Sequence, residues 1–191
     1  MFQHNQALKD GGAIKYDFRR PTMLNNSFSN NTAQYGDNIA SYAAKIVQRN
    51  TLNDYIEFNN IGSGVRDNQV LELALVDLDN QIMNQDSVSK ITITGFTPNS
   101  SLSGINSAIS NQGVAVFDDV AFVYRPGASD ILYRVTSSIL DSSKLAQIGL
   151  NDYSTISVSF RYCKPGESQS GLSSCITCAF GTYSIEWNST S

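Results

Sequence analysis

Apolar and polar residues alternate in short segments between residues 55 and 162, which is the pattern of half-buried β-strands. The alternation is clearest over 156–162, where every second residue is apolar or aromatic. Clusters of Gly, Pro, Asn, Asp and Ser separate the segments and indicate turns. No stretch keeps a helical period, and 137–150 has room for one helical turn at most. The pattern predicts strands at 55–58, 70–76, 91–94, 114–117, 120–124, 131–135 and 156–162.

So many short strands with regular turns predict an all-β fold, with an antiparallel β-sandwich over residues 51–163. The order of segments 73–81, 113–120 and 125–127 resembles that in immunoglobulin-like surface domains of bacteria and protists. The resemblance implies an immunoglobulin-like topology. The alternation alone predicts four buried core residues on different strands: Leu73, Ile93, Phe122 and Val158.

A short phrase occurs twice before residue 50. Gly11–Ile14 is echoed by Tyr35–Ala40, and Gly12 and Gly36 lie 24 residues apart. Short β-like phrases at this period, with Gly at the corners and Asn between them, are typical of β-coil solenoids. The phrases GGAI, FSNNTA and YGDNIAS resemble repeats of the polymorphic-outer-membrane-protein type of right-handed parallel β-helix. YGDNIAS in particular resembles the last coils in surface proteins of ciliated protists.

We therefore expect terminal β-helix coils over residues 1–50, with 43–47 as their last strand. A stack of two coils leaves an open face with unpaired backbone groups. We expect the chain to be a segment of a longer protein, in which preceding coils or a neighbouring subunit cover that face at Gly12, Ile14 and Phe28.

Three cysteines occupy the last part of the chain. Cys163 precedes a Pro-Gly pair, and Cys175-x-x-Cys178 precedes Gly-Thr-Tyr-Ser. This spacing resembles the cysteine module of growth-factor and ephrin receptors, whose start would occupy 164–191. The resemblance implies a disulfide between Cys163 and Cys175, with Cys178 unpaired or paired outside the chain. A structural zinc site would need four ligands, for which His4 is the only other candidate, and a thioredoxin-like role would need a βαβ setting.

The composition of the chain argues against two classes of binding partner. The net charge is −4 and the isoelectric point is near 4.8, so neither nucleic acid nor an anionic membrane surface is expected. No apolar run reaches the ~18 residues of a membrane span. Asn and Ser supply most of the polarity, which suits a secreted β-protein. Four sequons are glycosylation candidates, of which Asn99 is the strongest because it follows Pro98 in a turn, and Asn30 is alternatively a ladder residue between coils: Asn25, Asn30, Asn99 and Asn188.

Candidate chemical sites are few. Four carboxylates in turns are either calcium ligands or solvated turn residues: Asp77, Asp79, Asp118 and Asp119. A Ser-His-Asp triad is not expected, since His4 is the only histidine. The charged residues that the coils could offer to polysaccharide chemistry are Asp17, Arg19, Arg20, Asp37 and Lys45. We predict no catalytic residue, no metal and no cofactor.

The sequence thus predicts a non-enzymatic structural or adhesive segment of a large extracellular surface protein or filament. Its partners would be neighbouring domains or subunits, with a membrane anchor outside this chain. Two alternatives stay open. One is a carbohydrate-binding module that uses exposed aromatic residues, for which the candidates are Tyr16, Tyr35 and Tyr42. The other is the non-catalytic end of a carbohydrate-active β-helix enzyme.

Overall fold

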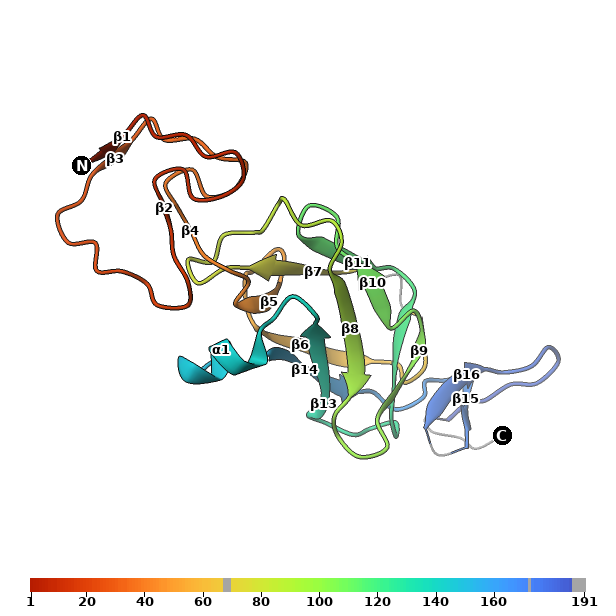
Figure 1. Ribbon diagram of the computed structural model, residues 1–191. Coiled ribbons are helices and arrows are strands. Elements are labelled where there is room, and N and C mark those ends of the chain that lie inside the picture. The colour runs from red at the N-terminus through yellow and green to blue at the C-terminus, as the bar shows by residue number, and fades with distance from the viewer. Residues whose placement is uncertain (67–69, 172, 187–191) are drawn as a thin grey trace.

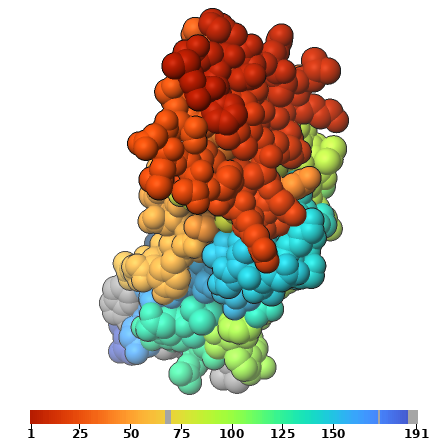
Figure 2. Space-filling view, turned by 60° about the vertical axis from the view of Figure 1, so that its left-hand side comes forward, coloured from red at the N-terminus to blue at the C-terminus, as the bar shows by residue number. Residues whose placement is uncertain are grey.

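The computed structural model describes residues 1–66, 70–171 and 173–186, which are almost entirely β-structure and turns (Figure 1). Three parts follow one another: a coil region (residues 1–40), a β-sandwich (45–160) and a C-terminal hairpin (167–177). The coil region lies at one end of the molecule and the hairpin at the other, with the sandwich between them (Figures 1 and 2). Within the described residues, no helix is long and apolar enough to cross a membrane.

The sandwich contains a five-stranded sheet that faces a three-stranded sheet and a two-stranded ribbon. The five-stranded sheet has the order β10 (Ser107–Ile109), β8 (Lys90–Gly95), β13 (Ile131–Ser137), β14 (Tyr153–Phe160) and β6 (Tyr55–Ile61). The three-stranded sheet has the order β11 (Val114–Phe117), β7 (Leu71–Val76) and β5 (Lys45–Gln48), and the ribbon pairs β9 (Ser101–Gly104) with β12 (Val120–Val123). The single helix of the described residues, α1 (Ser142–Gln147), begins at the N-cap Asp141.

One apolar core joins the two layers, and its largest fully buried side chain is Tyr133. The four predicted core residues are confirmed: Leu73, Ile93, Phe122 and Val158 are at most 5% exposed. Burial of each such side chain contributes roughly 1.5–3 kcal/mol. Because Ile93 of β8, Val135 of β13 and Val158 of β14 point inward, the outer face of the five-stranded sheet carries mainly polar and aromatic residues.

Several predicted boundaries were wrong. Strand β5 pairs with β7, so it is part of the sandwich and not the last strand of the coils. Strand β6 runs parallel to β14, so the sheet is not wholly antiparallel. Strand β6, predicted to end at residue 58, continues to Ile61 past a register shift, near which Asn60 has a φ of 61°. Helix α1, at six residues, exceeds the single turn expected.

The coil region consists of two passes of chain that run parallel to each other. β1 (Phe2–Gln3) pairs with β3 (Phe28–Ser29), and β2 (Ile14–Lys15) pairs with β4 (Ile39–Ala40). The Ile14–Ile39 register is one residue longer than the Gly12-to-Gly36 spacing of the sequence. A Cβ atom at Gly12 would overlap the carbonyl oxygen of Asp37, so this glycine permits the close approach of the two passes.

An asparagine pair links the two passes from within. Asn31 is buried, and its Oδ1 accepts hydrogen bonds from the backbone and side-chain nitrogens of Asn5, both at 3.0 Å. Its Nδ2 donates to the carbonyl of Phe2 and to Oδ1 of Asn38. Asn30, which the sequence offers either as a glycan site or as a ladder residue, is exposed. The ladder residue is its neighbour Asn31, because a one-residue shift along a β-phrase moves a side chain to the opposite face.

The hairpin of β15 (Glu167–Ser170) and β16 (Ser174–Thr177) is fastened to the sandwich in three ways. A disulfide joins Cys163 to Cys175, as the module resemblance implies. Arg161 forms a bidentate ion pair with Glu167, at 2.7 and 2.9 Å. The buried Ser63 accepts the backbone N–H of Cys175 through its carbonyl, at 2.9 Å, and donates its hydroxyl hydrogen to backbone carbonyls.

Candidate functional site

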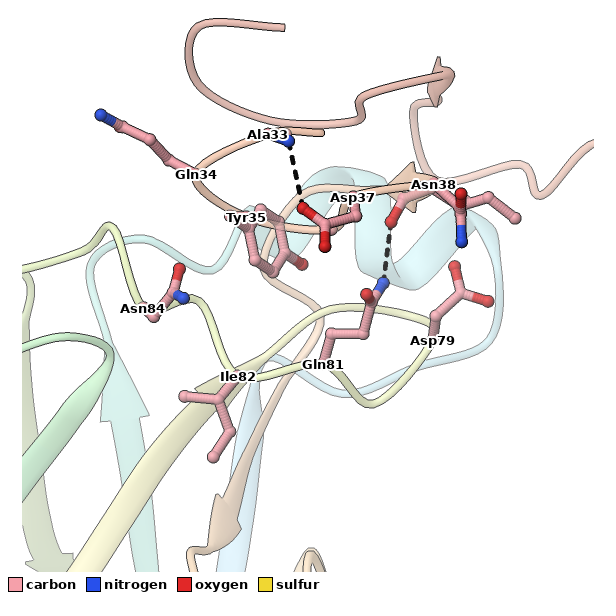
Figure 3. A pocket seen from close by; sticks show the side chains of 11 residues that line it. Ala33, Gln34, Tyr35, Asp37, Asn38, Asp79, Gln81, Ile82 and Asn84 are labelled. Atoms are coloured by element: carbon pink, nitrogen blue, oxygen red, sulfur yellow. Dashed lines mark hydrogen bonds between the residues drawn. The ribbon is translucent and has the colours of Figure 1, made fainter. Parts of the chain in front are cut away.

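The turn that follows β7 lies against the coil region and forms a polar cluster with it (Figure 3). We call this cluster the junction: Tyr16, Arg20, Tyr35, Ile39, Ser41 and the turn Asp77–Gln81. The turn closes through backbone hydrogen bonds between Asp77 and Gln81 and between Asn80 and Asp77. Asn80 takes a positive φ of 58°, which asparagine tolerates better than most residues.

Asp77 is the centre of the junction and is fully buried. Its Oδ1 accepts the backbone N–H groups of Asp79 and Gln81, both at 2.9 Å. Its Oδ2 accepts the backbone N–H of Ser41 and the side-chain amide of Gln81, both at 3.2 Å. A buried carboxylate is tolerated when several N–H donors replace its water shell. Since Ser41 directly follows the coil region, this carboxylate ties the coil to the sandwich.

Two further contacts cross the junction from the same turn. The side-chain amide of Gln81 donates to the carbonyl of Ile39 at 2.9 Å. The amide N–H of Leu78 donates to the hydroxyl of Ser41 at 3.1 Å. The last pass of the coil is thereby held by both backbone and side-chain groups of the sandwich.

Asp79 receives donors from the first pass of the coil. The Tyr16 hydroxyl donates to one oxygen at 2.5 Å, and Nε of Arg20 donates to the other at 2.8 Å. Burial raises the pKa of Tyr16 to about 12, and the hydrogen bond from Tyr16 to Asp79 is the second cause of this rise.

Tyr35 lies beside Asp77 in the same cluster. Its hydroxyl is buried and has no acceptor in good hydrogen-bond geometry among the described residues. Burial raises the pKa of Tyr35, and the nearby Asp77 carboxylate adds to the effect. Both tyrosines therefore stay neutral well above the ordinary pKa of a phenol.

An open polar groove of about 710 Å³ lies beside the junction (Figure 3). One wall is the second pass of the coil, from Ala33 to Ile39, and the other is formed by Asp79, Gln81, Ile82 and Asn84. In the second pass, Asp37 accepts the backbone N–H of Ala33 at 3.1 Å and so shapes the wall itself. The groove is lined by amides and carboxylates and could hold a polar ligand, but most of its charged groups already have partners in the chain.

The predicted calcium candidates do not meet in one site. The oxygens of Asp77 and Asp79 accept hydrogen bonds from protein donors, as described above. Asp118 and Asp119 occupy a different turn, between β11 and β12, where Asp119 pairs with Arg66 at 2.9 Å. Across the described residues, no group of three or more His, Cys, Asp or Glu side chains has the arrangement of a metal site.

The aromatic candidates for carbohydrate binding differ in exposure from the prediction. Tyr16 and Tyr35 are buried, at 7% and 3% exposed, so their assignment as exposed ligand-binding rings was wrong. Tyr42 is 46% exposed and stacks on Phe18 with the ring centroids 5.9 Å apart. The ammonium group of Lys15 lies 4.8 Å from the Tyr42 ring centroid.

The charged residues considered for polysaccharide chemistry do not gather in one site. Asp17 lies 3.8 Å from the ammonium of Lys144, while Arg20 belongs to the junction. Asp37 supports a wall of the groove, Arg19 is exposed, and Lys45 is in β5. The structure therefore brings only Arg20 and Asp37 to the region of the junction and groove.

The glycosylation candidates Asn25, Asn30 and Asn99 are exposed. Asn25 and Asn99 also have positive φ values, of 61° and 66°, which are typical of turns. Asn188 lies outside the described residues. Cys178 is partly buried and forms no disulfide within the described part of the chain.

Sequence reasoning missed Ser41 and Gln81, which complete the junction. A signal was available, because an aspartate that ends an apolar strand and precedes Asp-Asn-Gln can cap the following turn with its side chain. The pattern could not show that the coil would supply further donors. No protein-family model and no curated protein sequence matches the chain.

Proposed function

We propose that this chain is a non-enzymatic structural or adhesive segment of an extracellular surface protein or filament, in which the junction makes the coil region and the sandwich one rigid unit. The observation that carries the proposal is the buried carboxylate of Asp77, which accepts hydrogen bonds from its own turn and from Ser41, the residue that directly follows the coil region. A flexible linker between independent parts would have no need to bury a charge at their contact.

The arrangement of the three parts supports a role as a segment of an elongated structure. The coil region and the hairpin lie at opposite ends of the sandwich, so force applied at the two ends would cross the junction (Figure 1). The parallel passes, with their Asn5–Asn31 ladder, support assignment of the coil region to the end of a parallel β-helix. The two-layer packing supports an immunoglobulin-like sandwich. The disulfide favours an oxidising compartment.

The partners proposed for such a segment are neighbouring domains or subunits of the same assembly. The Phe2 and Phe28 rings stack at 5.2 Å between centroids, and both are only partly buried. A further pass with an aromatic residue in register would extend this stack. Such stepwise stacking is how solenoids bury their repeats.

Replacement of Asp77 by Asn tests the role of the junction. The variant keeps the shape of the side chain, but it removes the charge and turns an NH₂ group toward N–H donors. We expect the melting temperature of the whole chain to fall by about 2–10 °C, as a loss of about 1–3 kcal/mol predicts. Asp118→Asn, in an exposed turn, is the matched control and should melt like the wild type. An Asp77→Asn variant with unchanged melting would remove the main support for the proposal.

A further inference from the structure

Arg134 is held between two aromatic rings on the outer face of the five-stranded sheet. Its guanidinium carbon lies 4.5 Å from the ring centroid of Phe96 and 4.2 Å from that of Tyr153. The register explains the geometry. Arg134 stands opposite Thr94 on β8 and Thr155 on β14, and the two aromatic residues are its diagonal neighbours. Since the adjacent β13 residues point into the core, Arg134 points outward.

Two aromatic rings cover the guanidinium of Arg134. Its Nε–H is buried and has no hydrogen-bond partner, and no carboxylate of the described residues pairs with Arg134. Seven ion pairs join an arginine or lysine to Asp or Glu among the described residues, and Arg134 takes part in none of them. An arginine clamped in this way presents its N–H fork in a fixed plane, the geometry that a carboxylate accepts in bidentate fashion.

The surroundings of Arg134 suit a ligand with hydroxyl groups and an apolar ring face. Phe96 is 52% exposed, and Tyr55, which stands opposite Thr155 on the edge strand β6, is 51% exposed. Threonine and serine residues line the same face between these rings: Thr92, Thr94, Thr136, Thr155 and Ser159. The other charged residues on this face are Lys90 and Glu57, one of each sign. The local charge at Arg134 is thus positive, although the chain as a whole is acidic.

We propose that this outer face binds an acidic glycan, with the carboxylate of a uronic acid residue on Arg134. The sugar ring packs against the exposed part of Phe96 or Tyr55, and its hydroxyl groups bond to the threonine side chains. Charge complementarity selects this occupant, because the cation of Arg134 has no carboxylate partner among the described residues and a uronic acid supplies one. The site is separate from the junction, so the tests of the two proposals are independent. The glycan proposal can be wrong while the structural role is right, and the structural role can be wrong while the glycan proposal is right.

A matched pair of ligands tests the proposal on the whole chain. Isothermal titration with tetragalacturonate should give saturable binding, and its methyl ester, which lacks only the charges, should bind about tenfold or more weakly. Arg134→Gln should lose affinity for tetragalacturonate by a similar factor. Arg134→Lys should lose most of it too, because lysine keeps the charge but not the fork. Arg125→Gln, which removes an equal charge from an exposed turn, is the control and should bind like the wild type.

Several outcomes would overturn the proposal. These are the absence of binding by the wild type, equal binding of the ester, or an equal loss in the Arg134 and Arg125 variants, which would indicate general polyelectrolyte attraction. A wild-type dimer in sedimentation that dissociates in Arg134→Gln would assign the face to a second copy instead. If Arg134→Gln melts well below the wild type, Phe96→Leu supplies the second test. It retains an apolar side chain but opens one side of the clamp, and it should weaken tetragalacturonate binding without loss of the fold.

Discussion

Asp77 illustrates how one residue can set the relation between two parts of a protein. A carboxylate without water is costly unless donors surround it, and here the donors come from its own turn and from Ser41 at the end of the coil. The same logic applies to Asp79, whose donors Tyr16 and Arg20 come from the first pass. At the residue scale, the junction is therefore specified by hydrogen-bond satisfaction more than by apolar contact.

The junction tyrosines predict an alkaline limit to stability. The folded-state pKa values of Tyr16 and Tyr35 lie above the ordinary value near 10. Their contribution to the free energy of unfolding is therefore complete below pH 10 and is lost as the pH rises above it. Absorbance at 295 nm should show these two phenols ionising above the ordinary phenol pKa, together with unfolding. The Tyr16→Phe variant should lack part of this late change, whereas ionisation of Tyr16 and Tyr35 near pH 10 would contradict the assignment.

The core predicts a large cost for truncation at one position. Leu73 is fully buried between the two layers, so Leu73→Ala should lower the free energy of unfolding by about 2–5 kcal/mol in urea titrations. Leu24→Ala makes the same chemical change at a side chain that is 80% exposed, and it should cost much less. Similar losses in the two variants would mean that the register of β7 has been assigned to the wrong face.

At the scale of elements, the strands that could be predicted are those with an inward apolar face. Strands β8 and β11 lie within a residue of their predicted limits, because a two-residue period needs only local information. Strands β9 (SLSG) and β10 (SAI) are too short and have too few apolar residues to show that period, and they owe their structure to neighbouring strands. The parallel pairing of β6 with β14 joins residues about a hundred positions apart, which no local pattern records.

The candidate site was less predictable than the strands. Asp77 and Asp79 were singled out, but as metal ligands, because the sequence shows carboxylates and not the donors that surround them. Tyr16 and Tyr35 were expected on the surface, since an aromatic residue in a coil phrase can face either side of the backbone. The Asn ladder lies one residue from the sequence candidate for the same reason.

The C-terminal hairpin predicts an acid-sensitive contact. Hydrogen bonds from Arg161 hold the pKa of Glu167 below its ordinary value, so this carboxylate adds stability above the unfolded-state pKa near 4.3. That stability is lost as the pH falls through the lowered folded-state pKa. Limited proteolysis of the hairpin should accelerate below pH 4 in the wild type. Glu167→Gln should already be sensitive at pH 7, and equal protection in both proteins at pH 7 would contradict this account.

Loss of the Cys163–Cys175 disulfide should also release the C-terminal hairpin. It closes a loop with a sequence separation of 12 residues, for which chain entropy gives a stabilisation of about 3 kcal/mol. Reduction, or a Cys163→Ser and Cys175→Ser double variant, should release the hairpin and leave the core of the sandwich folded. Near-ultraviolet circular dichroism of the buried Tyr133 reports on that core, and its collapse on reduction would show that the hairpin supports the whole sandwich.

At the scale of the whole molecule, the coil region, sandwich and hairpin follow one another along the length of the protein (Figure 2). The coil region has few apolar residues of its own in the core, and those it has, such as Phe18, Tyr35 and Ala40, pack against the sandwich. The stability of the coil region should therefore depend on its contacts with the sandwich at the junction. The outer face of the five-stranded sheet remains free of the junction and available for the proposed glycan site.

Native-state hydrogen exchange in low concentrations of denaturant tests the central claim most directly. If the junction makes one rigid unit, the amide hydrogens of Ile14 and Tyr16, which donate to carbonyls of the second pass, should exchange with the same free energy and denaturant dependence as those of β7. In Asp77→Asn they should become separable, with the coil amides exchanging first. Independent exchange of the Ile14 and Tyr16 amides in the wild type, at a much lower free energy than those of β7, would contradict the account.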